Sequence, residues 1–348
     1  MRGAILPGNS TVEVVDLPDP TPGPGQVLLA VRASTICGSD IRAIYREHIQ
    51  GDLAETYQNV VAGHEPAGQV IELGAGTKRL SVGDRVAVYH INGCGQCEEC
   101  VQGYQIGCTS PSRAAYGWQR DGGHADLLLV EERDCIVLPE SVSYLDGACV
   151  ACGFGTAYEG LLRASVSGRD SLAVVGLGPV GLAAGLLGRA LGAVPRVGVD
   201  PSEARRALAL ELGAVDVACA PDEVETLTDT LGAGAHVAID CSGSTAGRKS
   251  AVSLLRTRGR MVLVGEGNAF EVDEASPALI HQQITVFGSW VTSLGHMREL
   301  VERLPVWGLR PEVVVSDRFD LEQAGEAYRL ADAGQSGKVA IVFGSEAG

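Results

Sequence analysis

The sequence has no apolar run long enough to cross a membrane. A membrane-spanning helix needs ~20 consecutive apolar residues, and no segment of this 348-residue chain reaches that length. The amino terminus, Met-Arg-Gly-Ala-Ile-Leu-Pro-Gly, also lacks the apolar core of a secretory signal. We therefore expect a cytoplasmic protein that has no membrane partner.

The sequence also lacks an excess of basic residues. It carries 27 Lys and Arg against 43 Asp and Glu, a formal net charge of -16. Nucleic acids and anionic membrane surfaces bind basic faces through the release of counterions, so we expect neither as a partner. The content of 45% hydrophobic and 20% charged residues is ordinary for a globular protein, and the length predicts about two domains.

A disulfide framework is not expected either, although the chain has 10 cysteines, because no export signal accompanies them. Four cysteines share one glycine-flanked loop: Cys94, Cys97, Cys100 and Cys108. A spacing of three residues brings the thiolates together around one point, which indicates a metal-binding site. Paired disulfides and an iron-sulfur cluster are the alternatives, but a ferredoxin run usually closes with Cys-Pro and recurs. We expect a structural zinc, because four thiolates leave no open position for a substrate.

The pattern along the chain predicts two kinds of domain. Short β-branched runs broken by Gly, Pro and Asp fill the first 150 residues and indicate an antiparallel, barrel-like β domain. Strands and helices then alternate, which predicts a parallel, doubly wound sheet. Its expected strands are 171–176, 196–200, 237–241, 261–265 and 284–289, with helices at 179–192 and 202–212. The last strand, 338–343, looks like those of the first domain, so the chain is expected to return there.

A glycine fingerprint follows the first strand of the second domain. Gly176, Gly178 and Gly181 occupy the G-x-G-x-x-G positions, with Pro179 and Val180 opening a helix. This pattern permits a tight turn, close approach to a pyrophosphate and close packing of helix on strand. Backbone contacts from Cys241 and Val264, at the carboxyl ends of two later strands, are also expected.

An acidic residue ends the next strand. Asp200 lies about 20 residues after the fingerprint, where a carboxylate accepts hydrogen bonds from the adenosine ribose and repels a 2′-phosphate. The sequence therefore predicts NAD in preference to NADP. Arg205 either flanks this ribose or is a solvated helix charge.

A second possible metal site joins residues that are far apart in the sequence. Cys37, His64 and Cys152 would supply two thiolates and one imidazole, which leave a fourth tetrahedral position open to water or substrate. Taken singly, Cys37 would be interpreted as a small buried hydrophobic residue and His64 as a core or turn histidine.

Five ordered motifs resemble the zinc-containing medium-chain alcohol and polyol dehydrogenases. They are Cys-Gly-Ser-Asp, Gly-His-Glu, the four-cysteine lobe, Cys-Gly-Phe-x-Thr and the dinucleotide fingerprint, and together they cover essentially the whole chain. The residues of the first two motifs resemble the threonine and polyol branches of this family more than the primary-alcohol branch. The resemblance implies a GroES-like β-barrel catalytic domain over residues 1–153, with the structural zinc lobe at about 90–110. A Rossmann domain would follow over 154–290, a return segment over 291–348, and the active site would lie in the cleft between the domains.

The resemblance also implies roles for single residues. Cys37, His64 and Cys152 would hold a catalytic zinc, with Glu65 as an exchangeable fourth ligand. Asp40 would orient His64, Ser39 would touch the substrate oxygen and Thr156 would lie near the nicotinamide. Phe154 would either wall the cleft or pack in the core. The implied reaction uses zinc to lower the pKa of an alcohol toward neutrality, so that hydride passes to NAD.

Two basic residues have less certain roles. Arg42 stands where many relatives carry a relay histidine, and guanidinium cannot accept a proton at neutral pH. The relay would then use solvent or another group such as His48, and Arg42 would contact cofactor phosphate or an anionic substrate unless it is an exposed charge. Lys338 would reach the pyrophosphate or be a surface charge.

The leading interpretation is a dehydrogenase with two zinc ions per chain that interconverts a secondary alcohol and a ketone. The alcohol would be a polyol, cyclitol, sugar or amino alcohol. Alternatives are an NADP-linked carbonyl reductase, a non-catalytic zinc- and NAD-binding regulatory protein, and a zinc-free quinone reductase, which would lack Cys37, His64 and Cys152. A homodimer or homotetramer is expected through the edge strand at 284–289.

Overall fold

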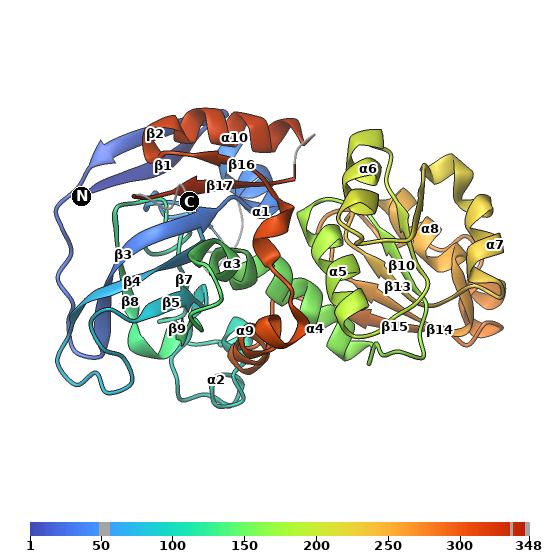
Figure 1. Cartoon of the computed structure of the whole chain (residues 1–348), viewed down its shortest axis with the longest axis horizontal. Helices are drawn as coiled ribbons and strands as arrows, with labels where there is room; N and C mark the ends of the chain where they lie inside the picture. Colours follow the sequence, from blue (N-terminus) through green and yellow to red (C-terminus); the bar gives the residue numbers. More distant parts are fainter. Residues whose placement is uncertain (49–55, 335–336, 345–348) are drawn as a thin grey trace. The chain divides into compact units, whose positions relative to one another are not determined.

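The computed structural model describes residues 1–48, 56–334 and 337–344. The chain forms two compact units (Figure 1), one made of Met1–Gly155 with Thr292–Gly348 and the other of Thr156–Val291. The first unit thus uses both ends of the chain, and the second uses one continuous middle segment. Within the described ranges, no helix is long and apolar enough to cross a membrane.

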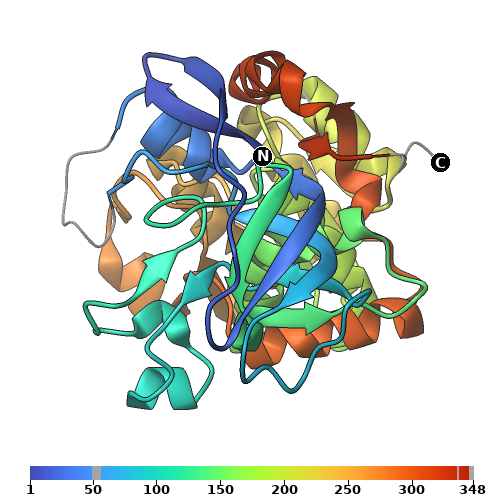
Figure 2. The same cartoon turned by 90° about the vertical axis from the view of Figure 1, so that its left-hand side faces the viewer.

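The first unit is built around strand β3 (Gln26–Thr35), the longest strand of a 7-stranded sheet. One edge of β3 pairs antiparallel with β4 (Glu65–Leu73). Its other edge is shared, because β8 (Leu127–Glu131) pairs with its first half and β17 (Lys338–Val342) with its last residues. Figure 2 shows β3 (blue) beside β8 (green). The expected return of the last strand to the first domain's sheet is thus observed.

The remaining elements of the first unit complete the sheet and surround it. The strands are β1 (Arg2–Gly8), β2 (Thr11–Asp16), β5 (Arg85–Val88), β6 (Ile91–Asn92), β7 (Ala114–Ala115), β9 (Cys135–Val137) and β16 (Val315–Phe319). The helices are α1 (Gly38–Asp40), α2 (Glu98–Val101), α3 (Tyr144–Cys149), α9 (Leu294–Trp307) and α10 (Ala324–Ala333). Two π-helical stretches, Ile41–Tyr45 and Val150–Phe154, follow α1 and α3. The core is apolar and includes Leu29, Val31, Val86, Leu128 and Ile341.

The second unit is a parallel 6-stranded sheet in the order β12-β11-β10-β13-β14-β15. Its strands are β10 (Leu172–Val175), β11 (Arg196–Val199), β12 (Val217–Cys219), β13 (Ala235–Asp240), β14 (Leu255–Leu263) and β15 (Thr285–Gly288). Its helices are α4 (Gly155–Arg163), whose first residue belongs to the first unit, α5 (Pro179–Ala190), α6 (Glu203–Glu211), α7 (Thr228–Leu231) and α8 (Thr245–Ser253). The strand order reverses at β10, where doubly wound folds bind dinucleotides.

One strand of this sheet, β12, was not expected from the sequence. β12 has only three residues, too few for its alternation to stand out from a loop. Four other strands lie within two residues of the expected ranges, whereas β14 begins at Leu255, six residues before the expected 261. β15 is an edge strand as expected. The buried core of the unit includes Ala173, Val175, Val197, Ala238 and Met261.

Candidate functional site

One cluster of metal-ligating side chains lies where β3 ends and where β4 and β17 begin. Thr35, the last residue of β3, pairs with Glu65 on β4 and with Ala340 on β17. Cys37 lies two residues after β3 and His64 directly precedes β4, so the register of β3 with β4 brings both side chains together. Cys152 arrives from the π-helical stretch after α3. π-helical turns often occur at functional sites.

The structure brings the four predicted ligands together. Potential ligand atoms of Cys37, His64, Glu65 and Cys152 all lie within 4.8 Å of one another. The Sγ atoms of Cys37 and Cys152 are 4.0 Å apart, close to the spacing that two thiolates take around a tetrahedral zinc with Zn–S bonds of about 2.3 Å. The donor set of two sulfurs and one imidazole therefore fits a zinc ion with one further position.

Asp40 fixes two of these ligands at once. Its Oδ1 atom lies 2.7 Å from Nδ1 of His64, and its Oδ2 atom accepts a hydrogen bond of 3.0 Å from the amide of Cys37. This leaves Nε2 of His64 as the ligating atom, as expected for a carboxylate-held metal histidine. Burial alone would lower the pKa of His64, but the interactions with Asp40 and Cys37 together raise this pKa.

Two aromatic side chains around His64 were not predicted. Nε1 of Trp118 donates to Oδ1 of Asp40 over 3.3 Å. The ring of His90 lies 5.0 Å from that of His64, and its Nδ1 atom donates to the carbonyl of Ala151, next to Cys152. Burial lowers the pKa of His90 to about 3, so His90 stays neutral. No spacing in the sequence marks either residue, because both reach the cluster only through the fold.

Lys338 corrects an expectation of the sequence analysis. It is the first residue of β17, is 3% exposed, and lies 2.8 Å from Oε1 of Glu65, so the interpretation as a surface charge is wrong. The Thr35 hydroxyl also donates to Glu65. Burial raises the pKa of Glu65 to about 7, an effect that the charge of Lys338 opposes.

The second cysteine group forms a separate lobe, which projects around α2 in Figures 1 and 2. The Sγ atoms of Cys94, Cys97, Cys100 and Cys108 lie within 4.8 Å of one another. None of the ten cysteines, all of which the structure describes, forms a disulfide. Hydrogen bonds from the amides of Gln96 and Cys97 lower the pKa of Cys94 to about 6. These amides thus favour the thiolate of Cys94, the form in which a cysteine binds zinc.

Backbone geometry explains the glycine fingerprint of the second unit. Gly176 has φ +88°, and a Cβ there would lie 2.7 Å from the amide nitrogen of Ser242. A Cβ on Gly181 would lie only 1.8 Å from the carbonyl oxygen of Gly176. Gly178 precedes α5, and Pro179 and Val180 form its first turn. The amino terminus of α5 thereby remains open to a phosphate, as the fingerprint requires.

Asp200 lies beside the fingerprint loop. The register pairs Val175 with Val199 on one side and with Asp240 on the other, so the segments that follow the three strands are neighbours. Asp200 accepts hydrogen bonds from the amides of Leu177 and Ser202, at 2.7 and 2.8 Å. Arg205 lies 3.9 Å from Asp200 and is partly exposed. Cys241 and Val264 follow β13 and β14 at the same edge.

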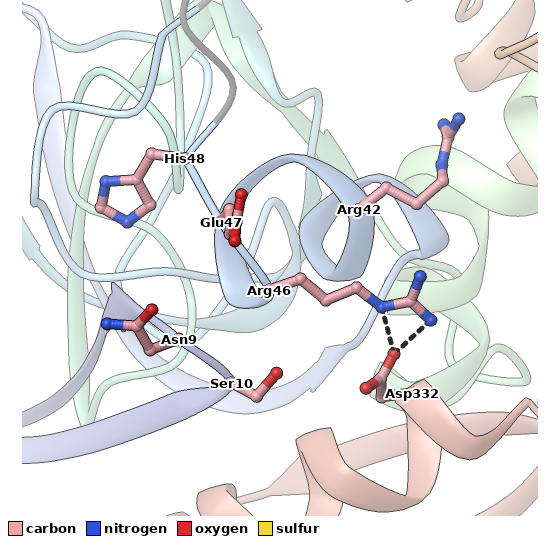
Figure 3. A pocket seen from close by; sticks show the side chains of 7 residues that line it. All are labelled: Asn9, Ser10, Arg42, Arg46, Glu47, His48 and Asp332. Carbon is pink, nitrogen blue, oxygen red and sulfur yellow. Dashed lines mark hydrogen bonds and ion pairs between the residues drawn. The ribbon is translucent and has the colours of Figure 1, made fainter.

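Other predicted residues have simpler positions. Ser39 is half-buried in α1 beside Cys37, and Thr156 belongs to the second unit, in the first turn of α4. Phe154 is 1% exposed, in agreement with core packing. Arg42 is exposed and lines an open pocket of about 620 Å³ with His48, among others (Figure 3). Nε2 of His48 donates to the carbonyl of Leu6.

Comparison with known proteins agrees with this fold and these clusters. Residues 23–140 match the alcohol dehydrogenase GroES-like domain, and residues 179–305 match the zinc-binding dehydrogenase family. The chain is 48% identical to the uncharacterized zinc-type alcohol dehydrogenase-like protein YphC of Escherichia coli strain K12, over 99% of both chains. It is 29% identical to the L-threonine 3-dehydrogenase of Pyrococcus horikoshii, over 95% of both.

A solved structure shows the same fold. Alcohol dehydrogenase TADH from Thermus sp. ATN1 is 28% identical, with a TM-score of 0.87 over 98% of this chain and 99% of that one. The predicted fold class, a GroES-like domain with a Rossmann doubly wound sheet, is confirmed. The chain belongs to the zinc-type medium-chain alcohol dehydrogenase family. It is accordingly a zinc-dependent, NAD(P)-linked oxidoreductase of the class that acts on CH–OH groups.

Proposed function

We propose that this protein transfers hydride between NAD and a secondary alcohol, interconverting the alcohol and its ketone. The substrate class is a polyol, cyclitol, sugar or amino alcohol. The observation that carries the proposal is the cluster of Cys37, His64 and Cys152, whose donors leave one position for a substrate oxygen. The name of its threonine dehydrogenase relative, which denotes an amino alcohol oxidised at carbon 3, supports a secondary alcohol.

The residues of the first unit would have separate roles at the proposed zinc site. A zinc ion held by Cys37, His64 and Cys152 supplies a Lewis acid that brings the pKa of an alcohol toward neutrality. Asp40 would keep His64 in one tautomer, and Ser39, in α1 after Cys37, would hydrogen-bond the substrate hydroxyl. When no substrate is bound, the carboxylate of Glu65 would occupy the fourth position of the zinc. Lys338 donates a hydrogen bond to this carboxylate.

The second unit would bind the dinucleotide. Gly176, Gly178 and Gly181 leave room for the pyrophosphate at the start of α5, and Thr156, Cys241 and Val264 would contact the cofactor. Asp200 would accept the ribose hydroxyls and repel a 2′-phosphate, which favours NAD. A higher kcat/KM with NADP than with NAD would reverse this assignment.

An NAD-coupled absorbance screen of sugars, polyols, cyclitols and amino alcohols tests the proposal, with zinc measured on the same sample. The expected result is turnover of at least one secondary alcohol by a protein with two zinc ions per chain. Full zinc without turnover of any alcohol or carbonyl would favour the non-catalytic regulatory alternative. The domain limits, the cytoplasmic location and the homodimer or homotetramer stay predictions.

A further inference from the structure

Two loops at the carboxyl edge of the second unit's sheet are packed backbone against backbone. One loop, 241–244, follows β13, and the other, 264–268, follows β14. A Cβ on Gly265 would lie 2.2 Å from the amide nitrogen of Gly243. The amide of Asn268 donates to the carbonyl of Gly243 over 3.0 Å. The first loop also touches the glycine fingerprint, through the close approach of Gly176 to Ser242.

Arg248 links the two loops from inside the unit. It lies on α8, which follows the first loop, and is only 7% exposed. Its Nη2 atom donates to the carbonyl of Gly265 over 2.7 Å, and its Nη1 atom donates to the carbonyl of Asn268. Both acceptors belong to the second loop.

Asp240 connects the same guanidinium to the first loop. It is fully buried at the end of β13, and its Oδ2 atom accepts from Nε of Arg248 over 3.1 Å. Its Oδ1 atom accepts from the amide of Ser242 over 2.9 Å and from the Ser242 hydroxyl over 2.6 Å. One buried ion pair therefore fixes both loops.

Stability alone is a weak reason for this arrangement. Removing two charges from water is unfavourable, and an apolar pair of the same volume is often equally stable or more stable. What an apolar pair cannot do is orient backbone groups. In a trans peptide the N–H points opposite to the carbonyl, so by holding the carbonyls of Gly265 and Asn268, Arg248 also directs the following N–H groups away from itself.

We propose that Arg248 is a positioning residue for the dinucleotide. Through Asp240 and the two carbonyls it holds the 241–244 and 264–268 loops in the arrangement that binds the cofactor before the cofactor arrives. Preorganised loops bind more tightly because they lose less conformational freedom on binding. The inference rests on the proposed NAD-linked function.

Arg248→Met tests the role, with Lys249→Met as the matched control. Lys249 is the next residue of α8 and loses the same charge, but it pairs with an exposed Asp273. NADH affinity is measured by fluorescence titration, and thermal unfolding on the same samples. We expect Arg248→Met to raise the Kd for NADH about 10- to 100-fold and Lys249→Met to leave it within twofold. The KM for NAD should rise with Kd, with a much smaller change in kcat.

Two further variants separate positioning from folding. Arg248→Lys keeps a cation opposite Asp240 but cannot reach all three acceptors, so we expect a smaller rise in Kd, about 3- to 10-fold. The double variant Asp240→Asn/Arg248→Met leaves no unpaired buried charge and should bind NADH as weakly as Arg248→Met. Wild-type affinity in a folded Arg248→Lys or double variant would overturn the inference. Wild-type protein that binds no NADH would instead overturn the proposed function.

Discussion

Lys338 and Glu65 form a buried ion pair although they are 273 residues apart in the chain. The Lys338 Nζ atom lies 2.8 Å from Oε1 and 2.5 Å from Oε2 of Glu65, and neither side chain is more than 4% exposed. The carboxylate is one of the four groups of the proposed catalytic zinc cluster. Its negative charge is therefore balanced inside the protein by a residue from the last strand.

Replacing Lys338 should destabilise the first unit. Lys338→Met leaves Glu65 buried without its partner, and breaking a buried pair in this way typically costs about 3 to 5 kcal/mol. Urea unfolding measures the loss, with the exposed Lys78→Met as the control. Adding Glu65→Gln to Lys338→Met should restore much of the stability. If Lys338→Met and Lys78→Met are equally stable, the ion pair of Lys338 with Glu65 contributes little to stability.

The two cysteine clusters should respond differently to the loss of one thiolate. Cys94→Ala opens a closed four-sulfur site, so we expect loss of folding or assembly first. Cys152→Ala should remove turnover while NADH affinity stays within about threefold of wild type, because the fingerprint glycines lie in the second unit. Circular dichroism, zinc content and NADH titration on both variants give the comparison. The opposite pattern would mean that the structural and catalytic assignments are exchanged.

Trp118 should influence metal binding through Asp40. Its indole N–H donates to the same Oδ1 atom that lies against His64. Trp118→Phe removes this donor, and loss of such outer partners typically weakens metal binding 10- to 100-fold, so we expect about tenfold at this more distant position. Zinc retained after dialysis against a chelator measures the effect. The exposed Trp290→Phe is the control, and equal retention by both variants would contradict the prediction.

Asp134 should make stability depend on pH. Burial raises its pKa from 3.8 to about 6. The folded state therefore holds the proton more tightly than the unfolded state, so this contribution is complete below about pH 4 and is lost as pH rises through about 6. The loss should be on the order of 2 to 3 kcal/mol. Asp134→Asn mimics the protonated acid and should flatten this part of the profile, which unfolding between pH 4 and 7 measures. A parallel profile in wild type and variant would refute the assignment.

The sequence was a good guide wherever local pattern determines structure. Gly176 and Gly181 were identified from the spacing of the fingerprint, and at Gly181 the constraint is local, because a Cβ there would collide with the carbonyl of Gly176. The strands of the second unit were found from their apolar runs, apart from the three-residue β12. The candidate ligands Cys37, His64 and Cys152 could be proposed from their residue types, but assigning them together to a catalytic zinc required a family resemblance, because no periodicity relates residues so far apart.

The partners around those ligands were beyond the sequence. Lys338 meets Glu65 only because β17 and β4 both pair with β3 at Thr35, so a single-residue change of register would separate the pair. Trp118 reaches Asp40 from a loop without a repeating pattern. Arg248 was missed for a different reason, since a charged residue in a helix is normally solvated, and its burial depends on the loops that surround it.

The discontinuity of the first unit has a consequence for biosynthesis. The second unit is one uninterrupted segment and can fold once residue 291 has left the ribosome. The sheet that carries Cys37 and His64 is incomplete until residues 338–342 emerge, well after the second unit. Nascent chains thus carry the cofactor unit before they carry a finished metal centre. Assembly of the proposed catalytic zinc cluster therefore depends on a strand that is synthesised after the whole second unit.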